Sequence, residues 1–385
     1  MEQQKEKIKV SKRQRTQLTL SFPLDLTSEI LLRLPEKSVA RFRCVSKLWL
    51  SITTDPYFIR LFETRYPRPS LLLCFTEYDK LFVSLIPQYH HSLQGSNKSY
   101  SCSHRLDLYQ FQFQLYPNVP PTETVQGLFC FQQSASTPIV CNPSTRQILT
   151  LSKPRMSWEN LTIFLGYDPV ECKHKVMCMP FRRSSDVCRV LTLGSAEESW
   201  RTVKTKPKHR SDSHTSGQCI KGVVYYIAYV YRTSVWVIMS FDVRSEKFGM
   251  IQLPSDVMMN PIIAYEGRLA FVRRETKKDA KLTLRILEDP EKRKWSSKGF
   301  LAPVWYKDES LSTYFYVRGI THAGEFIYVP DTYHKSSYIL FCDPVRSSFR
   351  RFELGGIMED KAVVNTLYFH KLHAFPNHVE NQMSL

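Results

Sequence analysis

Two kinds of hydrophobic pattern divide the chain. Between Phe22 and Ile52, apolar residues recur three or four positions apart, which is the spacing of side chains on one face of an α-helix. After Pro69 the pattern changes to short apolar runs separated by polar turns, which is typical of β-strands. The order therefore predicts a small all-α unit followed by a larger all-β unit.

The helical stretch predicts a first helix that begins near Pro23. Proline suits the first turn of a helix, where its missing N–H leaves no hydrogen bond unmade. Leu24, Ile30 and Leu34 follow at helical spacing. Pro35 ends this helix, because the residue before a proline avoids the α conformation.

Two shorter helices are expected next. Ser38 can cap one that carries Val39, and Ser46 can cap another that carries Trp49. So few residues cannot bury all of these apolar side chains among themselves. Some of this surface must face a partner protein or the larger unit. On periodicity alone, a docking module and a helical cap on the larger unit are equally good interpretations.

The all-β part contains an internal repeat. Three segments, 140–154, 240–254 and 341–355, align without gaps. Each has an apolar strand, then an Asn or Asp, and then bulky apolar residues six and nine positions further on. An Asn or Asp suits a turn because its side chain can accept hydrogen bonds from nearby backbone N–H groups. The polar anchors of the three segments are Asn142, Asp242 and Asp343.

Weaker matches lie between these segments. They begin at Gly194 and Asp289 and place Trp200 and Trp295 six positions further on. Units that begin about 50 residues apart are typical of β-propeller blades of the kelch kind. We expect the two tryptophans to be buried at matching positions of different blades.

Strands predicted at 70–75, 80–86, 106–115 and 362–370 are left over from this repeat. Together they can form one more blade, which would join the two ends of the domain and leave no exposed sheet edge. We therefore predict a kelch-like β-propeller of about six blades. A long mixed β-sandwich is the competing arrangement.

The charge of the chain points to an acidic partner. Its 385 residues include 53 Lys and Arg against 36 Asp and Glu, a net charge of +17. Such a charge favours association with an acidic protein or with nucleic acid. It lies in separate clusters, at 12–15, 201–210 and 273–281, rather than along one groove with stacking aromatic residues. Nucleic acid is therefore the less favoured partner.

The two later clusters are expected on exposed loops. One hypothesis is that the first of them selects an acidic or phosphorylated segment of a target, because Lys and Arg make charge-assisted hydrogen bonds to phosphate. The alternative is that both are solvated turns that keep the protein soluble. The candidate substrate-binding residues are Lys204, Lys206, Lys208 and Arg210.

The sequence offers no motif for catalysis. The spacing of Cys172, His174, Cys178 and Cys188 is not that of a structural zinc site, and the ten cysteines include no C-x-x-C pair. We expect no enzymatic activity, no cofactor and no metal. The chain has no apolar run of about 18 residues, and its first residues are charged, so we expect no membrane span, no secretory signal, and a location in the cytoplasm or nucleus.

The sequence FPLDLTSEILLRLP, followed by KSVARFRCVSKLW and DPYF, resembles an F-box in the form found near the N-terminus of plant F-box proteins. The resemblance covers Phe22 to about Phe62. It implies three helices that dock on an acidic Skp-type adaptor and, through it, on a cullin. Phe22 stands where Leu or Ile is commoner before the proline. The positions that would face the adaptor are Pro23, Leu24, Ile30, Leu34, Pro35, Val39, Val45 and Trp49.

The region from Gly127 to Trp295 resembles the F-box-associated domain of plant proteins, through pieces such as NPSTRQILTL, LGYDPV and SFDVRSEKF. We expect a basic, disordered tail at 1–20, and the two resemblances imply an F-box at 21–66 and an F-box-associated domain at 67–385. They imply a non-catalytic substrate-recognition subunit of an SCF-type ubiquitin ligase, with an unknown protein substrate. The alternative is a binding protein outside the ligase, for RNA for example, that uses its basic surface.

Overall fold

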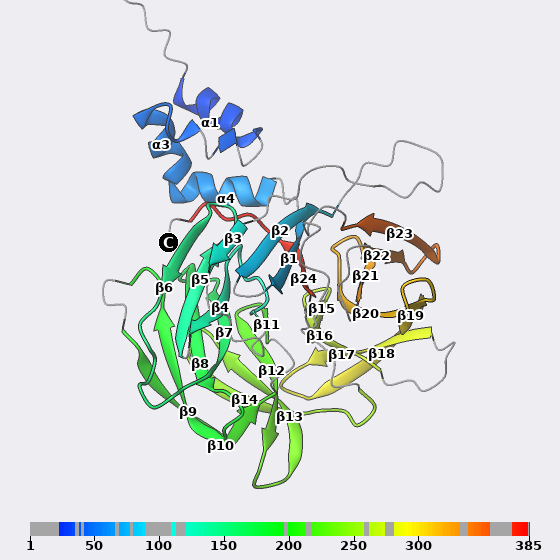
Figure 1. Cartoon of the computed structure of the whole chain (residues 1–385). Helices are drawn as coiled ribbons and strands as arrows, with labels where there is room; N and C mark the ends of the chain where they lie inside the picture. The colour runs from blue at the N-terminus through cyan, green and yellow to red at the C-terminus, as the bar shows by residue number, and fades with distance from the viewer. Residues whose placement is uncertain are drawn as a thin grey trace, which may run out of the picture. The chain divides into compact units, whose positions relative to one another are not determined.

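The computed structural model shows two compact units, Met1–Arg65 and Tyr66–Leu385 (Figure 1). The predicted basic tail at 1–20 lies outside the described residues. The structure describes residues 23–34, 38–39, 42–65, 69–77, 80–88, 109–112, 121–134, 136–195, 199–212, 217–257, 262–273, 281–330, 338–354, 372–383 and 385.

The small unit consists of short helices with one apolar core. Its helices are α1 (Leu24–Leu32), α3 (Lys47–Thr54) and α4 (Pro56–Arg65). The helix predicted after Ser38 falls partly on residues outside the described set and stays a prediction. The buried residues of the core are Leu31, Leu32, Val39, Phe58 and Phe62.

Capping residues set where α3 and α4 begin. Ser46 is the N-cap of α3, as predicted, and its hydroxyl accepts a hydrogen bond from the N–H of Leu48 at 3.2 Å. Asp55 caps α4 in the same way, with a carboxylate oxygen that accepts from the N–H of Tyr57 at 2.8 Å. Periodicity did not predict α4, although Asp followed by Pro56 is a common start of a helix.

The described strands of the large unit pair only in antiparallel fashion. Its first and last described strands share one sheet, in which β24 (Leu372–His378) pairs with β1 (Ser70–Glu77), followed by β2 (Lys80–Pro87) and β3 (Tyr109–Gln112). A closing strand was expected at 362–370. Those residues lie outside the described set, and the strand that pairs with β1 is β24.

The other described strands form four sheets. A three-stranded sheet contains β4 (Phe129–Ser134), β5 (Thr137–Asn142) and β6 (Gln147–Thr150). An eight-stranded sheet contains β7 (Leu161–Asp168), β8 (Lys173–Pro180), β9 (Ser185–Thr192), β10 (Arg201–Ser211), β11 (Gln218–Ile220), β12 (Val223–Val230), β13 (Val235–Asp242) and β14 (Lys247–Gln252). A four-stranded sheet contains β15 (Ile263–Tyr265), β16 (Arg268–Val272), β17 (Lys281–Asp289) and β18 (Lys294–Pro303). A five-stranded sheet contains β19 (Trp305–Asp308), β20 (Thr313–Ile320), β21 (Phe326–Pro330), β22 (Tyr338–Asp343) and β23 (Ser348–Glu353).

One turn geometry is repeated between strands. At the end of β13, a carboxylate oxygen of Asp242 accepts a hydrogen bond from the N–H of Ser245 at 2.6 Å. Glu246 then has a positive φ of 56°, which completes a four-residue loop before β14. The anchors predicted at Asn142, Asp242 and Asp343 are confirmed in this role. Asp168 and Asp308 were not predicted, because they lie at hairpins outside the aligned segments. The same arrangement occurs at Asn142, Asp168, Asp289, Asp308 and Asp343.

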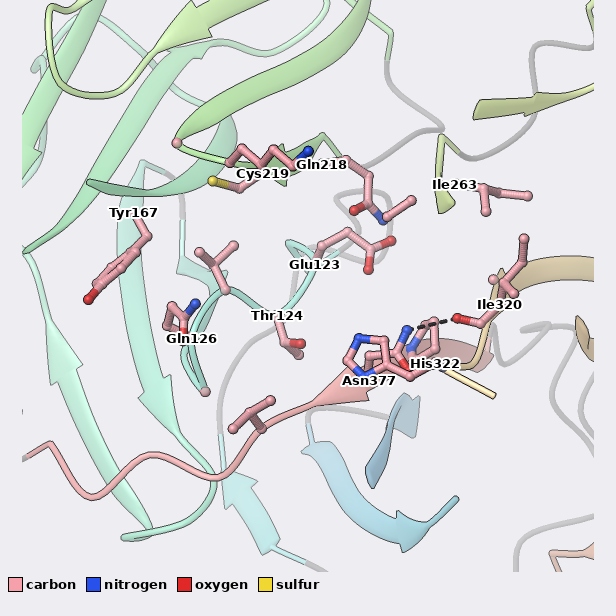
Figure 2. Close-up of a pocket in the computed structure, with 18 of the residues that line it drawn as sticks. Glu123, Thr124, Gln126, Tyr167, Gln218, Cys219, Ile263, Ile320, His322 and Asn377 are labelled. Carbon is pink, nitrogen blue, oxygen red and sulfur yellow. Dashed lines mark hydrogen bonds between the residues drawn. The ribbon is translucent and has the colours of Figure 1, made fainter. Parts of the chain in front are cut away.

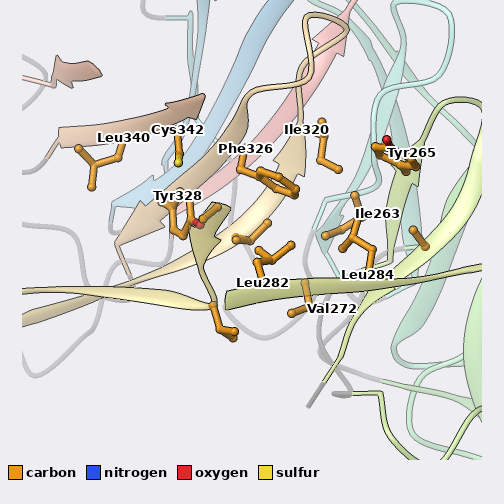
Figure 3. Packing of buried hydrophobic residues seen from close by; sticks show 14 of the residues in the cluster. Ile263, Tyr265, Val272, Leu282, Leu284, Ile320, Phe326, Tyr328, Leu340 and Cys342 are labelled. Atoms are coloured by element: carbon orange, nitrogen blue, oxygen red, sulfur yellow. The ribbon is translucent and has the colours of Figure 1, made fainter. Parts of the chain in front are cut away.

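Hydrophobic clusters connect neighbouring groups of strands face to face. Figure 3 shows one of them, in which Ile263, Leu282 and Leu284 from β15 and β17 belong to the same cluster as Phe326 and Tyr328 from β21. All these side chains are buried. Because both faces of these strands are covered, their sequences read as short continuous apolar runs.

Among the described residues of the large unit, six such clusters form a closed cycle. The sheet of β24, β1 and β2 packs on β21–β23 through one face and on β4–β5 through the other. Further clusters join β4–β5 to β7–β9, β7–β9 to β12–β13, β11–β14 to β16–β17, and β15–β17 to β20–β22. This cycle is the arrangement of a propeller. The count of about six blades stays a prediction, because β10 also pairs with β12 and joins two groups into one sheet.

Trp200 and Trp295 were predicted to be buried, but both are half-buried. Trp200 packs on the cluster between β4–β5 and β7–β9, and Trp295 on the cluster between β11–β14 and β16–β17. The indole N–H of Trp200 donates to the backbone oxygen of Ser152 at 2.9 Å. Its polar edge therefore stays near the surface while its ring covers the core.

Asn142 differs from the Asp residues at the other turns because its side chain also donates hydrogen bonds. Its Oδ1 accepts from the N–H of Ser144 at 3.0 Å. Its Nδ2 donates to the backbone oxygens of Asn381 at 3.0 Å and Met383 at 2.8 Å. A carboxylate can accept the first bond but cannot donate the other two, so the amide attaches the segment after β24 to this turn.

We expect Asn142→Asp to lower the free energy of unfolding by roughly 2–4 kcal/mol, because it removes two hydrogen bonds and sets a carboxylate against two carbonyl oxygens. The matched control is Asp242→Asn, which keeps an oxygen acceptor at the same turn position and should cost less than about 1 kcal/mol. Denaturant unfolding measures both variants. Equal losses in the two would contradict the role given to the amide.

Two buried histidines should make the large unit sensitive to acid. Burial lowers the pKa of His174 and of His378 from 6.5 to about 4. Between these pH values the unfolded chain binds more protons than the folded one. The stability that both groups give above pH 6.5 is therefore lost as the pH falls toward 4.

Replacing His378 with Leu should reduce the slope of the unfolding free energy against pH by up to about 1.4 kcal/mol per pH unit, because one group no longer takes up a proton on unfolding. Unfolding free energies measured between pH 7 and pH 4.5 check the expectation. It would be wrong if wild type and variant lost stability in parallel.

Candidate docking and recognition surfaces

The small unit leaves apolar side chains exposed although its own core is filled. Of the predicted adaptor-facing residues, Pro23 is exposed, and Leu24, Ile30 and Val45 are 58%, 52% and 64% exposed. We call the exposed large hydrophobic side chains of the small unit its apolar surface. It consists of Leu24, Leu26, Ile30, Val45, Leu48, Leu50 and Tyr57.

Other predicted residues serve the core instead. Val39 is completely buried, so its side chain is enclosed by the unit and not presented to a partner, which corrects the prediction. Leu34 and Trp49 are half-buried and pack against the same core. The ring of Trp49 meets that of Phe42 edge to face, with 4.9 Å between the centroids. Pro35 lies outside the described residues.

Sequence reasoning missed four members of the apolar surface. Leu26 lies one helical turn before Ile30 on α1, so the two share a face, and Leu48 and Leu50 extend the set onto α3. The signal that could have found Leu26 is this spacing of four. Tyr57, on α4, could have been found only with that helix.

The basic residues predicted on a loop form a strand instead. Lys204, Lys206 and Lys208 belong to β10 and are exposed, whereas the alternate residues Thr205 and His209 are buried. Side chains in a strand point alternately to opposite faces, so the three lysines share the outer one. The predicted loop is therefore wrong, and the predicted exposure of the lysines is confirmed.

Arg210 is half-buried and contacts aromatic rings. Its guanidinium lies 5.5 Å, 5.8 Å and 5.5 Å from the ring centroids of Tyr229, Tyr231 and Trp236. Such cation–π contacts hold the guanidinium against the sheet. Arg210 thus differs from the three lysines, whose ammonium groups extend into solvent.

The second basic cluster lies largely outside the described residues, which exclude 274–280. At its edge, Arg273 and Arg285 both contact the carboxylate of Asp256, at 3.4 Å and 2.8 Å. This part of the surface is therefore partly neutralised. The hypothesis that the cluster lies on a loop stays a prediction.

A cavity of about 340 Å³ lies in the large unit where its inner strands converge (Figure 2). Its wall is formed by residues of β7, β11, β15, β20 and β24 and by the segment 123–127. Figure 2 shows polar side chains of Glu123, Gln218 and Asn377 on this wall. Ile263 and Ile320 also border it, but their side chains are buried in the cluster that joins β15–β17 to β20–β22. We call this site the central cavity. No local sequence pattern predicts it, because its residues come from distant parts of the chain.

The cysteine and histidine residues considered for zinc do not form a site. Cys172 is exposed, while His174, Cys178 and Cys188 are buried in sheets. The Nε2 of His174 lies 3.0 Å from the backbone oxygen of Val125. Within the described ranges, no group of three or more His, Cys, Asp and Glu could hold a metal ion.

Comparison with known families matches both units. The F-box domain model matches residues 19–61, and the model of the F-box associated beta propeller domain matches residues 70–379. The chain belongs to the F-box proteins with an F-box-associated propeller. The resemblances noted in the sequence, and the predicted order of a helical F-box followed by an all-β propeller, are thereby confirmed. Hereafter the small unit is called the F-box and the large unit the propeller.

Relatives of this F-box protein share its whole length. Two Arabidopsis thaliana proteins that carry the F-box name are 60% and 58% identical to it over 394 and 392 residues, and each match covers 100% of both chains. A further Arabidopsis thaliana F-box protein is 39% identical and covers 95% of this chain and 93% of its own. None of the helices in the described part of the chain has the length and apolar character needed to cross a membrane.

Proposed function

We propose that this F-box protein is the substrate-recognition subunit of an SCF-type ubiquitin ligase. The F-box docks on a Skp-type adaptor and, through it, on a cullin, while the propeller binds the target protein. The observation that carries the proposal is the apolar surface that the F-box leaves exposed although its core is filled. An exposed apolar surface of this kind in a small unit marks a site for a protein partner.

The size of the apolar surface suits a stable complex. Burying one large apolar side chain stabilises a complex by about 1.5–3 kcal/mol. Leu24, Ile30 and Val45 are 58%, 52% and 64% exposed, so covering each one contributes about half of that figure toward the roughly 8 kcal/mol of a micromolar complex. The remaining members of the surface offset the entropy lost on association.

We infer that the protein takes no chemical part in ubiquitin transfer. Members of the F-box family act as adaptors, and the reactive thioester and the accepting lysine then belong to other proteins. Binding and positioning the target is the work of the propeller. This role requires surfaces that discriminate among partners, not activated nucleophiles.

The three lysines of β10 are the proposed contact for the target. The pairing of β10 with β9 is irregular between Lys204 and His209, so the three lysines do not follow the even spacing of a regular strand. They nevertheless place three exposed cations along β10, which suits an acidic or phosphorylated segment of a target. The competing explanation is that these exposed lysines are only solvated and keep the protein soluble.

The alternative function is binding of RNA by the same lysines. The observation that favours it is the exposed ring of Tyr231, which lies beside the Arg210 guanidinium at one end of β10. Binding of single-stranded nucleic acid combines cations with aromatic rings on which bases stack. Reversing the charge of the three lysines and measuring both target capture and retention on RNA separates the two functions.

Changing Leu24 and Ile30 together to Glu should weaken adaptor binding at least about hundredfold, because two apolar contacts worth about 1.5 kcal/mol each are lost. Both side chains are exposed, so the F-box should stay folded. Calorimetric titration with a purified Skp-type adaptor measures the affinity. The control changes Met156 and Val345, two exposed apolar residues of the propeller, to Glu. Unchanged affinity in the F-box variant would contradict the proposed docking.

Changing Lys204, Lys206 and Lys208 to Glu should lower capture of the target at least about tenfold while adaptor binding is kept, because attraction to an acidic segment becomes repulsion. The measurement is affinity purification from plant cells with the cullin inhibited, followed by quantitative mass spectrometry.

The control for this experiment reverses the charge of Lys173, Lys247 and Lys294, three exposed lysines on other strands. Equal capture of the target by wild type and the β10 variant at physiological salt would mean that the three lysines are only solvated and do not bind the target. A loss confined to salt-sensitive retention on RNA would support the alternative function.

A further inference from the structure

Arg210 belongs to a row of residues that crosses three strands. It lies opposite Tyr229 of β12, and Tyr229 lies opposite Trp236 of β13. Side chains that are directly opposite on neighbouring strands share one face of the sheet. Tyr231 follows at the start of the turn after β12, and its ring meets that of Tyr229 edge to face, with 5.0 Å between the centroids. Three aromatic rings thus surround the end of one arginine side chain.

The guanidinium of Arg210 has unused hydrogen-bond donors. Within the described part of the chain, no hydrogen bond or ion pair joins it to another residue. Its Nε is buried without a partner, whereas its two terminal nitrogens remain accessible. By contrast, Arg268, Arg285 and Arg350 each contact a carboxylate. Cation–π contacts fix the position of the Arg210 guanidinium, and an anion is the ligand that its free donors suit best.

One ring of this group is open to a ligand. Tyr231 is 52% exposed, whereas Tyr229 and Trp236 are half-buried. The ring of a ligand can stack on Tyr231, whose centroid lies 5.8 Å from the Arg210 guanidinium. With one exposed ring of the three, the site suits a single aromatic group. A run of nucleotides would need several rings on which successive bases stack.

We propose that Arg210 and Tyr231 bind a phosphotyrosine residue of a target protein. The terminal N–H groups of Arg210 donate hydrogen bonds to the phosphate, and the phenyl ring stacks on Tyr231. Phosphotyrosine carries the anion and the ring on one side chain, and a guanidinium can donate two parallel hydrogen bonds to a phosphate. Lys208, which is exposed two positions before Arg210, adds positive charge beside the site. That the phosphotyrosine belongs to the ubiquitination target rests on the proposed function.

The test measures binding of short peptides to the purified full chain by calorimetric titration at low salt. The probe is acetyl-Gly-Gly-phosphotyrosine-Gly-Gly-amide, and two control peptides carry tyrosine or phosphoserine at the central position. We expect the probe to bind at least about tenfold tighter than the tyrosine peptide, which lacks the charge-assisted hydrogen bonds. It should bind at least about threefold tighter than the phosphoserine peptide, which lacks the stacked ring. Equal affinity of the probe and either control, or no binding of the probe, would overturn the inference.

Two variants separate the two contacts. Tyr231→Ala should remove the preference for phosphotyrosine over phosphoserine. Arg210→Lys keeps a positive charge but loses the planar pair of donors, so the probe should bind at least about fivefold more weakly. The matched control is Arg183→Lys, at an exposed arginine in the turn after β8, and it should leave binding of the probe unchanged. Unchanged binding in Arg210→Lys, or an unchanged preference in Tyr231→Ala, would contradict the site.

Failure of this inference is distinct from failure of the proposed function, because the peptide titration needs no adaptor. A chain that binds the adaptor but not the probe would overturn the inference and leave the proposed function standing. A chain that binds the probe but not the adaptor would contradict the proposed function alone. Single-stranded RNA that displaces the probe and binds more weakly to Tyr231→Ala would assign the site to the alternative function, and would also overturn the inference.

Discussion

The pairing of β24 with β1 is the constraint on which the propeller depends. It places the last described strand of the chain beside the first strand of the unit, with Leu73 opposite Ala374 and Phe75 opposite Leu372. The two clusters on either face of this sheet contain side chains from β24 as well as from β1 and β2. Without this pairing the cycle of clusters would be open, and β1 would have an exposed edge. The closed cycle also brings the inner strands around one central cavity.

The two units handle apolar surface in opposite ways. In the propeller each group of described strands packs against its neighbours, and the exposed large apolar side chains, such as Met156 and Val345, are few for the size of the unit. The F-box fills its core with few residues and leaves a further set of large apolar side chains in water. Such an arrangement is stable in a complex that covers these side chains. The proposed docking and the proposed recognition thus depend on different forces, apolar burial in one unit and charge in the other.

What the sequence predicted well depends on local chemistry. The turn anchors at Asn142, Asp242 and Asp343 could be recognised because an Asn or Asp side chain bonds the next few backbone N–H groups whatever the rest of the fold does. The cap of α3 by Ser46 is local in the same sense. The family resemblance of both units came from such short segments.

The predictions that failed needed long-range information. Val39 and Ile30 are both apolar at helical spacing, and only packing decides that one is buried and the other exposed. The strand β10 was taken for a loop because Lys and Arg hide its alternation, in which Val203, Thr205, His209 and Ser211 face inward. The central cavity has no sequence signal, since Glu123, Gln218 and Ile320 meet only when the ring closes.

If this F-box protein docks on a Skp-type adaptor as proposed, the two proteins must form one complex in solution. The most direct measurement is light scattering of the purified wild-type chain mixed with an excess of that adaptor, resolved by size-exclusion chromatography. We expect one peak with the mass of one adaptor added to the 45.1 kDa of the chain, and a further increase when the adaptor-binding part of a cullin is added. A chain that keeps a mass of 45.1 kDa in the presence of excess adaptor would contradict it.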